Sequence, residues 1–175
     1  MDKGTLYFFT GLSGAGKTTI GGLFFRRQKA KKNDIIVLDG DQIRPVYLDG
    51  IGYTNEDRLM GAARTFRVCK MLTDQGIDVV CCSISMYEEL RQWNRKHIDN
   101  YKEIYIKVTK ETLFQRDQKG LYSSGAKNVM GVDLPFDEPQ HPTVVVENDG
   151  QETPEAIVDR LEELFGLRDA KAGTK

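Results

Sequence analysis

The sequence predicts an α/β protein whose five-stranded parallel sheet is covered by helices on both faces. Over 175 residues, short apolar runs alternate with longer segments of helical periodicity, and this alternation is typical of parallel sheets. A glycine-rich stretch follows the first apolar run, and aspartates and serines follow the next two. Because ligands bind beyond the carboxyl ends of parallel strands, these polar residues indicate a ligand site.

Each expected strand is a short apolar run, and each expected helix carries apolar residues at helical spacing. The strands are expected at 5–10, 34–41, 77–85, 102–108 and 143–148, and the helices at 17–31, 55–76, 88–98, 110–118 and 153–166. Gly21 and Gly22 weaken the first helix. The last helix has favourable ends, because Thr153 can cap it, Pro154 fits its first position and Gly166 can stop it.

The chain is expected to form one domain over residues 1–167, followed by a small polar tail at 168–175 that we expect to be disordered. Residues 119–142 show no regular period and contain several glycines and prolines. A segment of this length without secondary structure inside a compact domain is usually functional. We therefore interpret residues 119–142 as a lid.

Composition argues against nucleic-acid and membrane partners. The net charge is −1, with 39% hydrophobic and 29% charged residues, so bulk electrostatics favours neither partner. Three cysteines in apolar surroundings indicate reduced thiols, and without a signal peptide the chain is expected to be cytoplasmic. The basic stretch at 26–32 favours a solvated helix end, with polyanion binding as the alternative. A homodimer is compatible with the sequence, which does not define an oligomeric state.

The glycine-rich stretch "GLSGAGKTT" satisfies the P-loop pattern in full. Its glycines allow a tight turn in which backbone N–H groups surround an anion, and the following helix adds its positive end. Lys17 would reach the β- and γ-phosphates, and the Thr18 hydroxyl would bind Mg²⁺. The residues expected to bind ATP here are Gly11, Ser13, Gly14, Ala15, Gly16, Lys17, Thr18 and Thr19. The motif in this context predicts a three-layer P-loop NTPase fold.

Two aspartates follow the second expected strand, beside the P-loop. Asp39 and Asp41 could hold Mg²⁺ or accept the proton of an attacking hydroxyl. Switch GTPases and motors also carry P-loops, but the chain lacks the guanine-reading signature and is short for a motor. Small size and a lid-like segment favour a kinase that excludes water from the transferred phosphoryl group. A nucleotide-binding regulator is the alternative, although Lys17, Thr18 and Asp39 are all present.

Further motifs extend this interpretation to a family. "GLSGAGKTT", "LDGDQIR", "GYTNEDR", "SIS", "RDQKGLY" and "GVDLPFDEP" occur in an order and spacing that resembles adenylylsulfate kinases, over residues 5–165. "KGLY" and "GVDLPFDEP" are more specific than the P-loop. The resemblance implies a kinase that uses MgATP to phosphorylate the 3′-hydroxyl of adenosine 5′-phosphosulfate.

The resemblance also implies roles for individual residues on the donor side. Asp39 would be the general base beside the 3′-hydroxyl, and Asp41 would lie near Mg²⁺ or the acceptor. Lys119 would reach the phosphates when the lid closes and would act in catalysis together with Lys17. Arg116 would lie on the adenine of ATP.

On the acceptor side the resemblance implies a nucleotide cleft. Arg44 and Arg58 match arginines that grip the anionic 5′ group, a task suited to the planar guanidinium. Tyr53 and Phe136 match an aromatic pair that sandwiches the base; packing in the core is the alternative for both. The cleft is completed by two further matching residues, Ile84 and Ser85.

Several positions depart from the family pattern, and most of them match its acceptor side. Gly61 replaces an asparagine, Ala63 an arginine, Met86 a proline and Glu88 an arginine, while the segment before "GVD" is shorter. These losses leave two acceptors open. The first is adenylylsulfate with rearranged contacts. The second is another activated nucleotide such as cytidine diphosphoramidate, which related capsule-pathway enzymes use and whose distal phosphorus carries an uncharged amide.

Overall fold

The chain folds around a five-stranded parallel sheet, as predicted. The computed structural model describes residues 2–117 and 120–168. The sheet has the order β2-β3-β1-β4-β5, and every neighbouring pair is parallel. Its strands are β1 (Thr5–Thr10), β2 (Ile35–Asp39), β3 (Asp78–Cys82), β4 (Asn100–Lys107) and β5 (Val144–Glu147).

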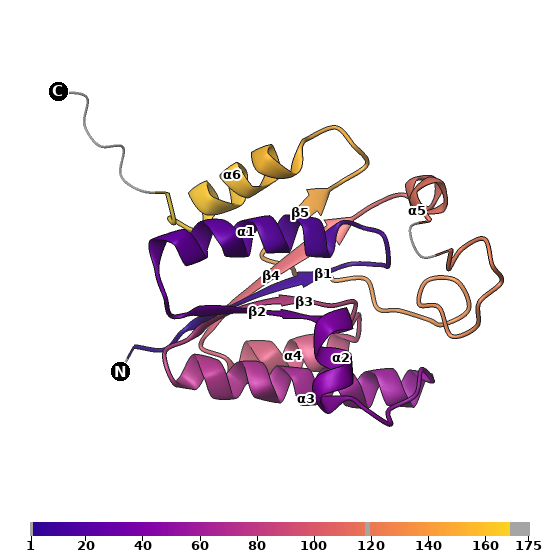
Figure 1. Ribbon diagram of the computed structural model, residues 1–175, viewed down its shortest axis with the longest axis horizontal. Helices are drawn as coiled ribbons and strands as arrows, with labels where there is room; N and C mark the ends of the chain where they lie inside the picture. The colour runs from indigo at the N-terminus through magenta and orange to yellow at the C-terminus, as the bar shows by residue number, and fades with distance from the viewer. Residues whose placement is uncertain (1, 118–119, 169–175) are drawn as a thin grey trace.

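Helices cover both faces of this sheet, which makes three layers (Figure 1). They are α1 (Lys17–Lys31), α2 (Gly40–Tyr47), α3 (Asn55–Asp74), α4 (Glu88–His97), α5 (Lys110–Arg116) and α6 (Pro154–Leu164). Helices α1 and α6 lie on one face and α3 and α4 on the other, while α2 and α5 lie toward the carboxyl ends of the strands. The predicted α/β class and layer arrangement are confirmed.

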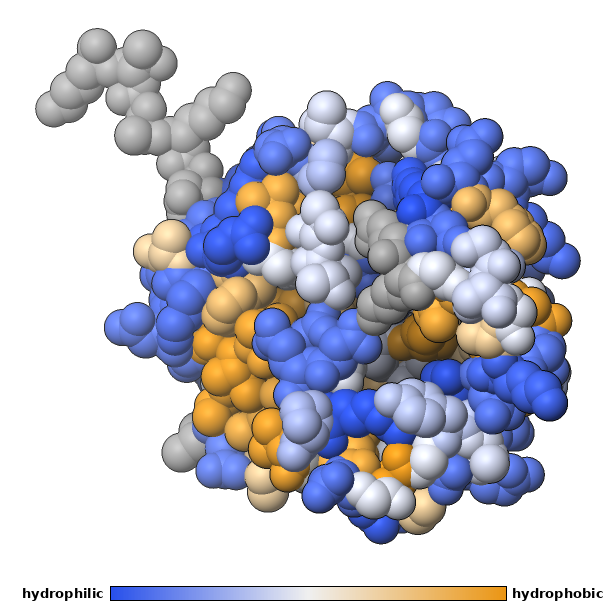
Figure 2. Space-filling view, turned by 45° about the vertical axis from the view of Figure 1, so that its right-hand side comes forward, coloured by the Kyte–Doolittle hydropathy of each residue, from blue (hydrophilic) through white to orange (hydrophobic). Residues whose placement is uncertain are grey.

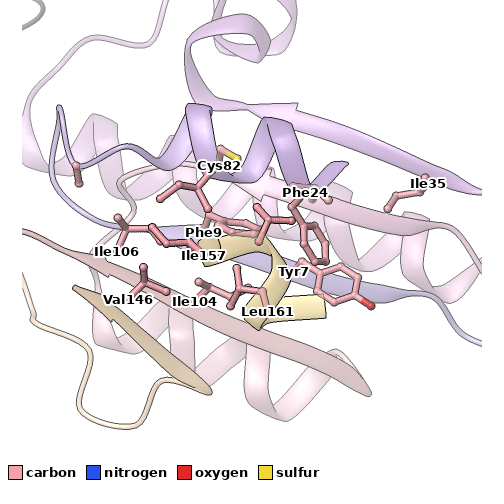
Figure 3. Packing of buried hydrophobic residues seen from close by; sticks show 14 residues of the cluster. Tyr7, Phe9, Phe24, Ile35, Cys82, Ile104, Ile106, Val146, Ile157 and Leu161 are labelled. Atoms are coloured by element: carbon pink, nitrogen blue, oxygen red, sulfur yellow. The ribbon is translucent and has the colours of Figure 1, made fainter. Parts of the chain in front are cut away.

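Two hydrophobic cores hold the layers together. In the first core, Phe24 of α1 and Ile157 and Leu161 of α6 pack on Tyr7 and Phe9 of β1 (Figure 3). In the second, Phe66 of α3 meets the Phe8 ring edge-to-face, with 5.0 Å between centroids. Alternate residues of β1 therefore serve opposite cores, because side chains alternate across a strand.

Helix α2 was not predicted, and the strand expected at 34–41 ends at Asp39 instead. Gly40 and Pro45 both disfavour helix, and they occur within the eight residues of α2. The sequence pattern of this segment therefore does not indicate a helix. Asp39 overrides this weak propensity as the N-cap, since its side chain accepts a hydrogen bond from the backbone N–H of Asp41 at 3.0 Å. The same residue therefore ends β2 and begins α2.

Helix α1 approaches the sheet closely at Gly21. A Cβ atom added there would lie 2.4 Å from the Cys82 sulfur and 3.3 Å from the Phe9 ring. At Gly22, the nearest atom is the end of the flexible Arg26 side chain, at 3.5 Å. The two glycines that weaken the predicted helix therefore differ: Gly21 lets α1 dock on the sheet, and Gly22 has no such role.

We expect Gly21→Ala to lower the free energy of unfolding by about 2 kcal/mol, because overpacking a dense core forces neighbours to shift. The matched control Gly22→Ala should leave stability unchanged or raise it by up to about 1 kcal/mol, through helix propensity. Chemical denaturation of the two variants measures the difference. Equal effects of the two substitutions would contradict the close approach at Gly21.

Charged side chains at the end of α1 pair with neighbouring carboxylates. Arg27 contacts Asp159 at 2.6 Å, and both Arg27 and Lys31 contact Glu162, at 3.2 and 3.3 Å. The basic stretch 26–32 is thus partly neutralised, which supports the solvated helix end. Hydrophilic side chains cover much of the face shown in Figure 2, interrupted by hydrophobic patches.

Two further observations concern the described residues. Cys69, Cys81 and Cys82 are free and buried, as the sequence predicts. None of the helices within 2–117 and 120–168 is both long and apolar enough to cross a membrane.

Candidate functional site

The P-loop is fixed by side chains that hold its carbonyl groups. The carbonyl of Leu12 accepts from Lys17 Nζ at 2.8 Å. The next three carbonyls accept hydrogen bonds from residues distant in the sequence: Ser13 from the Tyr122 hydroxyl at 2.7 Å, Gly14 from Arg116 at 3.4 Å and Ala15 from Asn148 at 2.8 Å. Four successive carbonyls are therefore engaged.

This arrangement leaves the opposite side of the loop available to an anion. Because the N–H and C=O of a trans peptide point in opposite directions, engaging the carbonyls turns the amides that follow them the other way. The Ala15 N–H is an exception, because it donates to the Leu12 carbonyl at 3.1 Å. Gly14 and Gly16 adopt φ of 79° and 104°, the left-handed region that allows such a turn. Helix α1 begins at Lys17 with Gly16 as N-cap, so its positive end faces the same space. The loop can hold a phosphate.

A carboxylate and a hydroxyl meet beside this loop, where β2 ends next to α1. The Thr18 hydroxyl donates to Asp39 Oδ2 at 2.6 Å, and Asp39 Oδ1 accepts from the Asp41 backbone. Asp39 is 6% exposed, whereas Thr18 and Asp41 are exposed. One buried carboxylate thus connects the P-loop to α2.

These groups open into one cavity of about 250 Å³. The predicted site residues that line it come from the P-loop, from both aspartates and from the expected acceptor side: Ser13, Gly14, Gly16, Lys17, Thr18, Thr19, Asp39, Asp41, Arg44, Tyr53, Arg58, Ile84 and Ser85. Residues of the phosphate loop and of the expected acceptor side therefore line the same cavity. Lys119, the remaining predicted catalytic residue, lies outside the described residues.

Two arginines surround Tyr53 at the acceptor side of this cavity. The Arg44 guanidinium lies 3.9 Å from the ring centroid and donates to the carbonyls of Ile51 and Gly52, at 2.5 and 2.6 Å. The Arg58 guanidinium lies 5.4 Å from the same centroid. Burial, and to a lesser extent the charge of Arg44, lower the pKa of Arg58, although a guanidinium remains charged in proteins.

Arg58 also connects the cavity to the segment after α5. Its Nε donates to the Tyr53 carbonyl at 3.1 Å, and its Nη2 donates to the Asn128 carbonyl at 2.6 Å. Asn128 has φ of 60°, and its N–H donates to the Asp133 carboxylate at 2.6 Å. One predicted acceptor ligand is thus hydrogen-bonded to the segment interpreted as a lid.

Of the predicted site residues that the structure describes, four are not among those that line the cavity. Gly11 and Ala15 are buried within the P-loop. Arg116 donates to the Asn148 carbonyl at 2.6 Å as well as to the loop. Phe136 packs against the second core, while Tyr53 is 55% exposed. The structure therefore does not bring Tyr53 and Phe136 together around a common space, and their pairing remains a prediction.

Several cavity residues were not predicted. Asp57 and Tyr87 line the acceptor side, and Met130 reaches it from the segment after α5, although it is only 3% exposed. Ser83 lines the cavity beside Ser85, and its place after a strand in "SIS" is a signal that could have identified it. The position of Met130 depends on how residues 120–143 fold back, which no local pattern encodes.

Glu88, one of the departures from the family pattern, has a local explanation. Its carboxylate contacts Arg91 and Arg95, each at 2.8 Å. Arg91 is fully buried and also lies 3.6 Å from the buried Glu103. A buried cation without its partner would be strongly destabilising. Glu88 therefore serves this network between α4 and β4 and is not among the residues that line the cavity.

A magnesium ion fits the oxygen atoms at the P-loop. Mg²⁺ prefers oxygen ligands and is commonly bound by one or two protein groups together with substrate phosphates. The Thr18 hydroxyl and the exposed Asp41 carboxylate provide such oxygens on the cavity wall. Across the described part of the chain there is no cluster of three or more His, Cys, Asp or Glu residues that could hold a metal.

The sequence is similar to a known family and to kinases of known name. A family model described as adenylylsulphate kinase matches residues 3–147. A cytidine diphosphoramidate kinase of Campylobacter jejuni is 39% identical in an alignment of 163 residues that covers 89% of this chain and 95% of that protein. An adenylyl-sulfate kinase of Picosynechococcus is 36% identical in an alignment of 169 residues that covers 94% of this chain and 96% of that protein.

A solved structure has the same fold. The APS kinase of Mycobacterium tuberculosis, in complex with AMPPNP and APS, superimposes with a TM-score of 0.86 at 28% identity. The match covers 95% of this chain and 99% of that one. Sequence and structural similarity therefore both extend over almost the whole length.

Proposed function

The chain belongs to the adenylylsulphate kinase family, and from this premise we propose that it transfers the γ-phosphate of ATP to the 3′-hydroxyl of cytidine diphosphoramidate. It is a kinase of that family. The donor, the metal ion, the acceptor and the residue roles given below are the proposal.

The engaged P-loop carbonyls support ATP as the donor. With its amides turned inward and the helix α1 terminus behind them, the loop suits a triphosphate. The relative solved with AMPPNP supports the same donor. Mg²⁺ bound through Thr18 and Asp41 would neutralise phosphate charge.

The proposed reaction needs a base and a cation beside the phosphate loop. Asp39 accepts the proton of the attacking 3′-hydroxyl, and its buried carboxylate is already oriented by two hydrogen bonds. Lys17, now bonded to the Leu12 carbonyl at 2.8 Å, turns to the β- and γ-phosphates and stabilises the charge that develops there. The hydrogen bond from Arg58 to Asn128 supports closure of the lid over the acceptor, which excludes water.

We choose between the possible acceptors from the residues that helix α3 contributes to the cavity wall. Gly61 and Ala62 line the cavity there, and a Cβ at Gly61 would lie 3.5 Å from a methyl group of Leu48. A sulfate can only accept hydrogen bonds, so it needs donors on every side. At this part of the wall neither Gly61 nor Ala62 has a side-chain donor, and the nearby Thr65 hydroxyl already donates to the Gly61 carbonyl at 3.0 Å. Arg58 is the donor that α3 retains in the cavity. An amide on phosphorus can itself donate, and Asp57 supplies a carboxylate in the same cavity.

Adenylylsulfate is the second candidate. Its support is the 36% identity to a kinase named for that substrate and the presence of both arginines, Arg44 and Arg58, on the cavity wall. Each arginine donates two hydrogen bonds to backbone carbonyls, which is fewer than the five N–H donors of a guanidinium, so sulfate binding would not have to replace those bonds.

The two acceptors are separated by measuring kcat/KM for each in a coupled assay of ADP release. We expect cytidine diphosphoramidate to exceed adenylylsulfate by about tenfold or more, because mismatched hydrogen-bonding groups in a closed site are strongly discriminated. A preference for adenylylsulfate would reject the proposed acceptor. Activity on neither nucleotide would reject the proposed function.

Gly61→Asn provides a sharper form of the same test, because it restores an amide to the α3 wall. We expect it to shift the ratio of kcat/KM toward adenylylsulfate by about tenfold, the value of one hydrogen bond to a charged group. Gly61→Leu is the matched control, since its side chain branches at the same position as that of asparagine without adding a donor. An equal shift in both variants would show that volume, and not hydrogen bonding, sets the preference.

A further inference from the structure

Two serine hydroxyls on the cavity wall form a pair, and only Ser85 of the two was predicted to line the acceptor cleft. Ser83 Oγ and Ser85 Oγ lie 2.8 Å apart, and both residues line the cavity together with Asp39. A hydroxyl has one donor and two acceptor sites. After one hydrogen bond between them, the pair still offers one proton and several lone pairs, so it can both donate to a ligand and accept from it.

The loop that carries the pair is held in place from the sheet. The N–H of Ser83 donates to the Phe9 carbonyl at 3.2 Å, and the buried Thr10 hydroxyl donates to the Ile84 carbonyl at 2.5 Å. Ser85 adopts φ of 33°, which is unfavourable for a residue with a side chain. Such strain persists only where the surroundings fix it, and it concentrates at functional sites.

The register of the sheet brings this pair next to Asp39. Strands β2 and β3 are parallel neighbours with Asp39 opposite Cys82, so Ser83 lies beside Gly40, the residue after Asp39. A Cβ built on Gly40 would be 3.4 Å from the Cβ of Ser83. A group held at Asp39 therefore has the serine hydroxyls as near neighbours on the adjacent strand end.

From this juxtaposition we infer that Ser83, supported by Ser85, binds the hydroxyl next to the one that is phosphorylated, and thereby selects ribonucleotide over deoxyribonucleotide acceptors. The inference rests on the proposed function, which holds the attacking 3′-hydroxyl at Asp39. In ribose the 2′-hydroxyl is cis to the 3′-hydroxyl. When the 3′-hydroxyl is held at Asp39, the 2′-hydroxyl must therefore lie to one side of Asp39. The 2′-hydroxyl both donates and accepts hydrogen bonds, and so does the serine pair, so the two groups are complementary.

The test compares cytidine diphosphoramidate with its 2′-deoxy analogue in wild type, Ser83→Ala and Ser83→Cys. For wild type we expect kcat/KM to be about tenfold higher with the ribose form, corresponding to one hydrogen bond. Both variants should lose about tenfold on the ribose form and little on the deoxy form, so that the ratio approaches one. Ser83→Thr, which keeps the hydroxyl, should retain the preference.

Several results would overturn the inference. One is a wild-type ratio near one, and another is a ratio unchanged by Ser83→Ala. A variant that lowers both substrates equally would indicate a structural effect, and thermal unfolding of each variant identifies a folding defect. If Ser83→Ala does not fold, Ser83→Cys, which nearly preserves the volume, decides. Phosphorylation of nucleotides with no ribose preference rejects this inference alone, whereas no phosphorylation of any nucleotide rejects the proposed function with it.

Discussion

Asp39→Asn is expected to lower kcat by about a thousandfold while the protein stays folded. The substitution removes the proton acceptor proposed for the attacking hydroxyl, and general-base catalysis contributes about a hundred- to ten-thousandfold. The fold should tolerate it, because an asparagine oxygen can still accept from the Asp41 N–H and cap helix α2. Single-turnover phosphorylation at saturating ATP and acceptor measures the effect on chemistry.

The matched control is Asp99→Asn, a carboxylate near the start of β4 that pairs with Lys3 at 3.0 Å. It should leave kcat unchanged. If Asp39→Asn retained most of its turnover with an unchanged unfolding midpoint, Asp39 would not be the base. A large loss of stability would instead assign it a mainly structural role at the end of β2.

Lys17→Met is expected to reduce kcat by about a hundred- to a thousandfold and to raise KM for ATP. A cation preorganised at the transferred phosphoryl group is worth about this much, since it stabilises charge that develops in the transition state. Methionine approximates the volume of the lysine stem, so helix α1 should form as before. Steady-state kinetics with varied ATP separates the two effects.

Lys29→Met is the control for Lys17, because it removes the same charge from the other end of the same helix. Lys29 is exposed and donates to the Asn33 carbonyl at 2.6 Å. We expect its kinetics to match wild type. Similar losses in both variants would mean that general destabilisation of α1, and not contact with phosphate, explains the result.

Alternation of apolar runs and helical segments was enough to predict the five strands, their parallel arrangement and five of the six helices found in residues 2–117 and 120–168. Helix α1 was predicted at its observed bounds. Helix α2 was missed because one side chain, Asp39, caps a segment whose own residues disfavour helix. Local propensity cannot reveal a helix that depends on its position beside β2.

The candidate site likewise contains residues that the sequence could predict and residues that it could not. The P-loop residues and Asp39 were predictable because local motifs encode them, and the cavity contains most of them. The carbonyl contacts from Tyr122, Arg116 and Asn148 were not, since these residues reach the loop from distant parts of the chain. The acceptor side depends on how Met130 and Arg58 meet the segment after α5, which is a tertiary property.

The position of the new phosphate on the product tests the central claim most directly. Wild-type enzyme is incubated with ATP labelled in the γ-phosphate and with cytidine diphosphoramidate, and the product is examined by ³¹P and proton NMR. We predict ADP and a labelled phosphomonoester whose phosphorus couples to the proton at the 3′-carbon of the ribose. A label at the 2′-carbon, at the distal phosphorus or only in inorganic phosphate would contradict transfer to the 3′-hydroxyl.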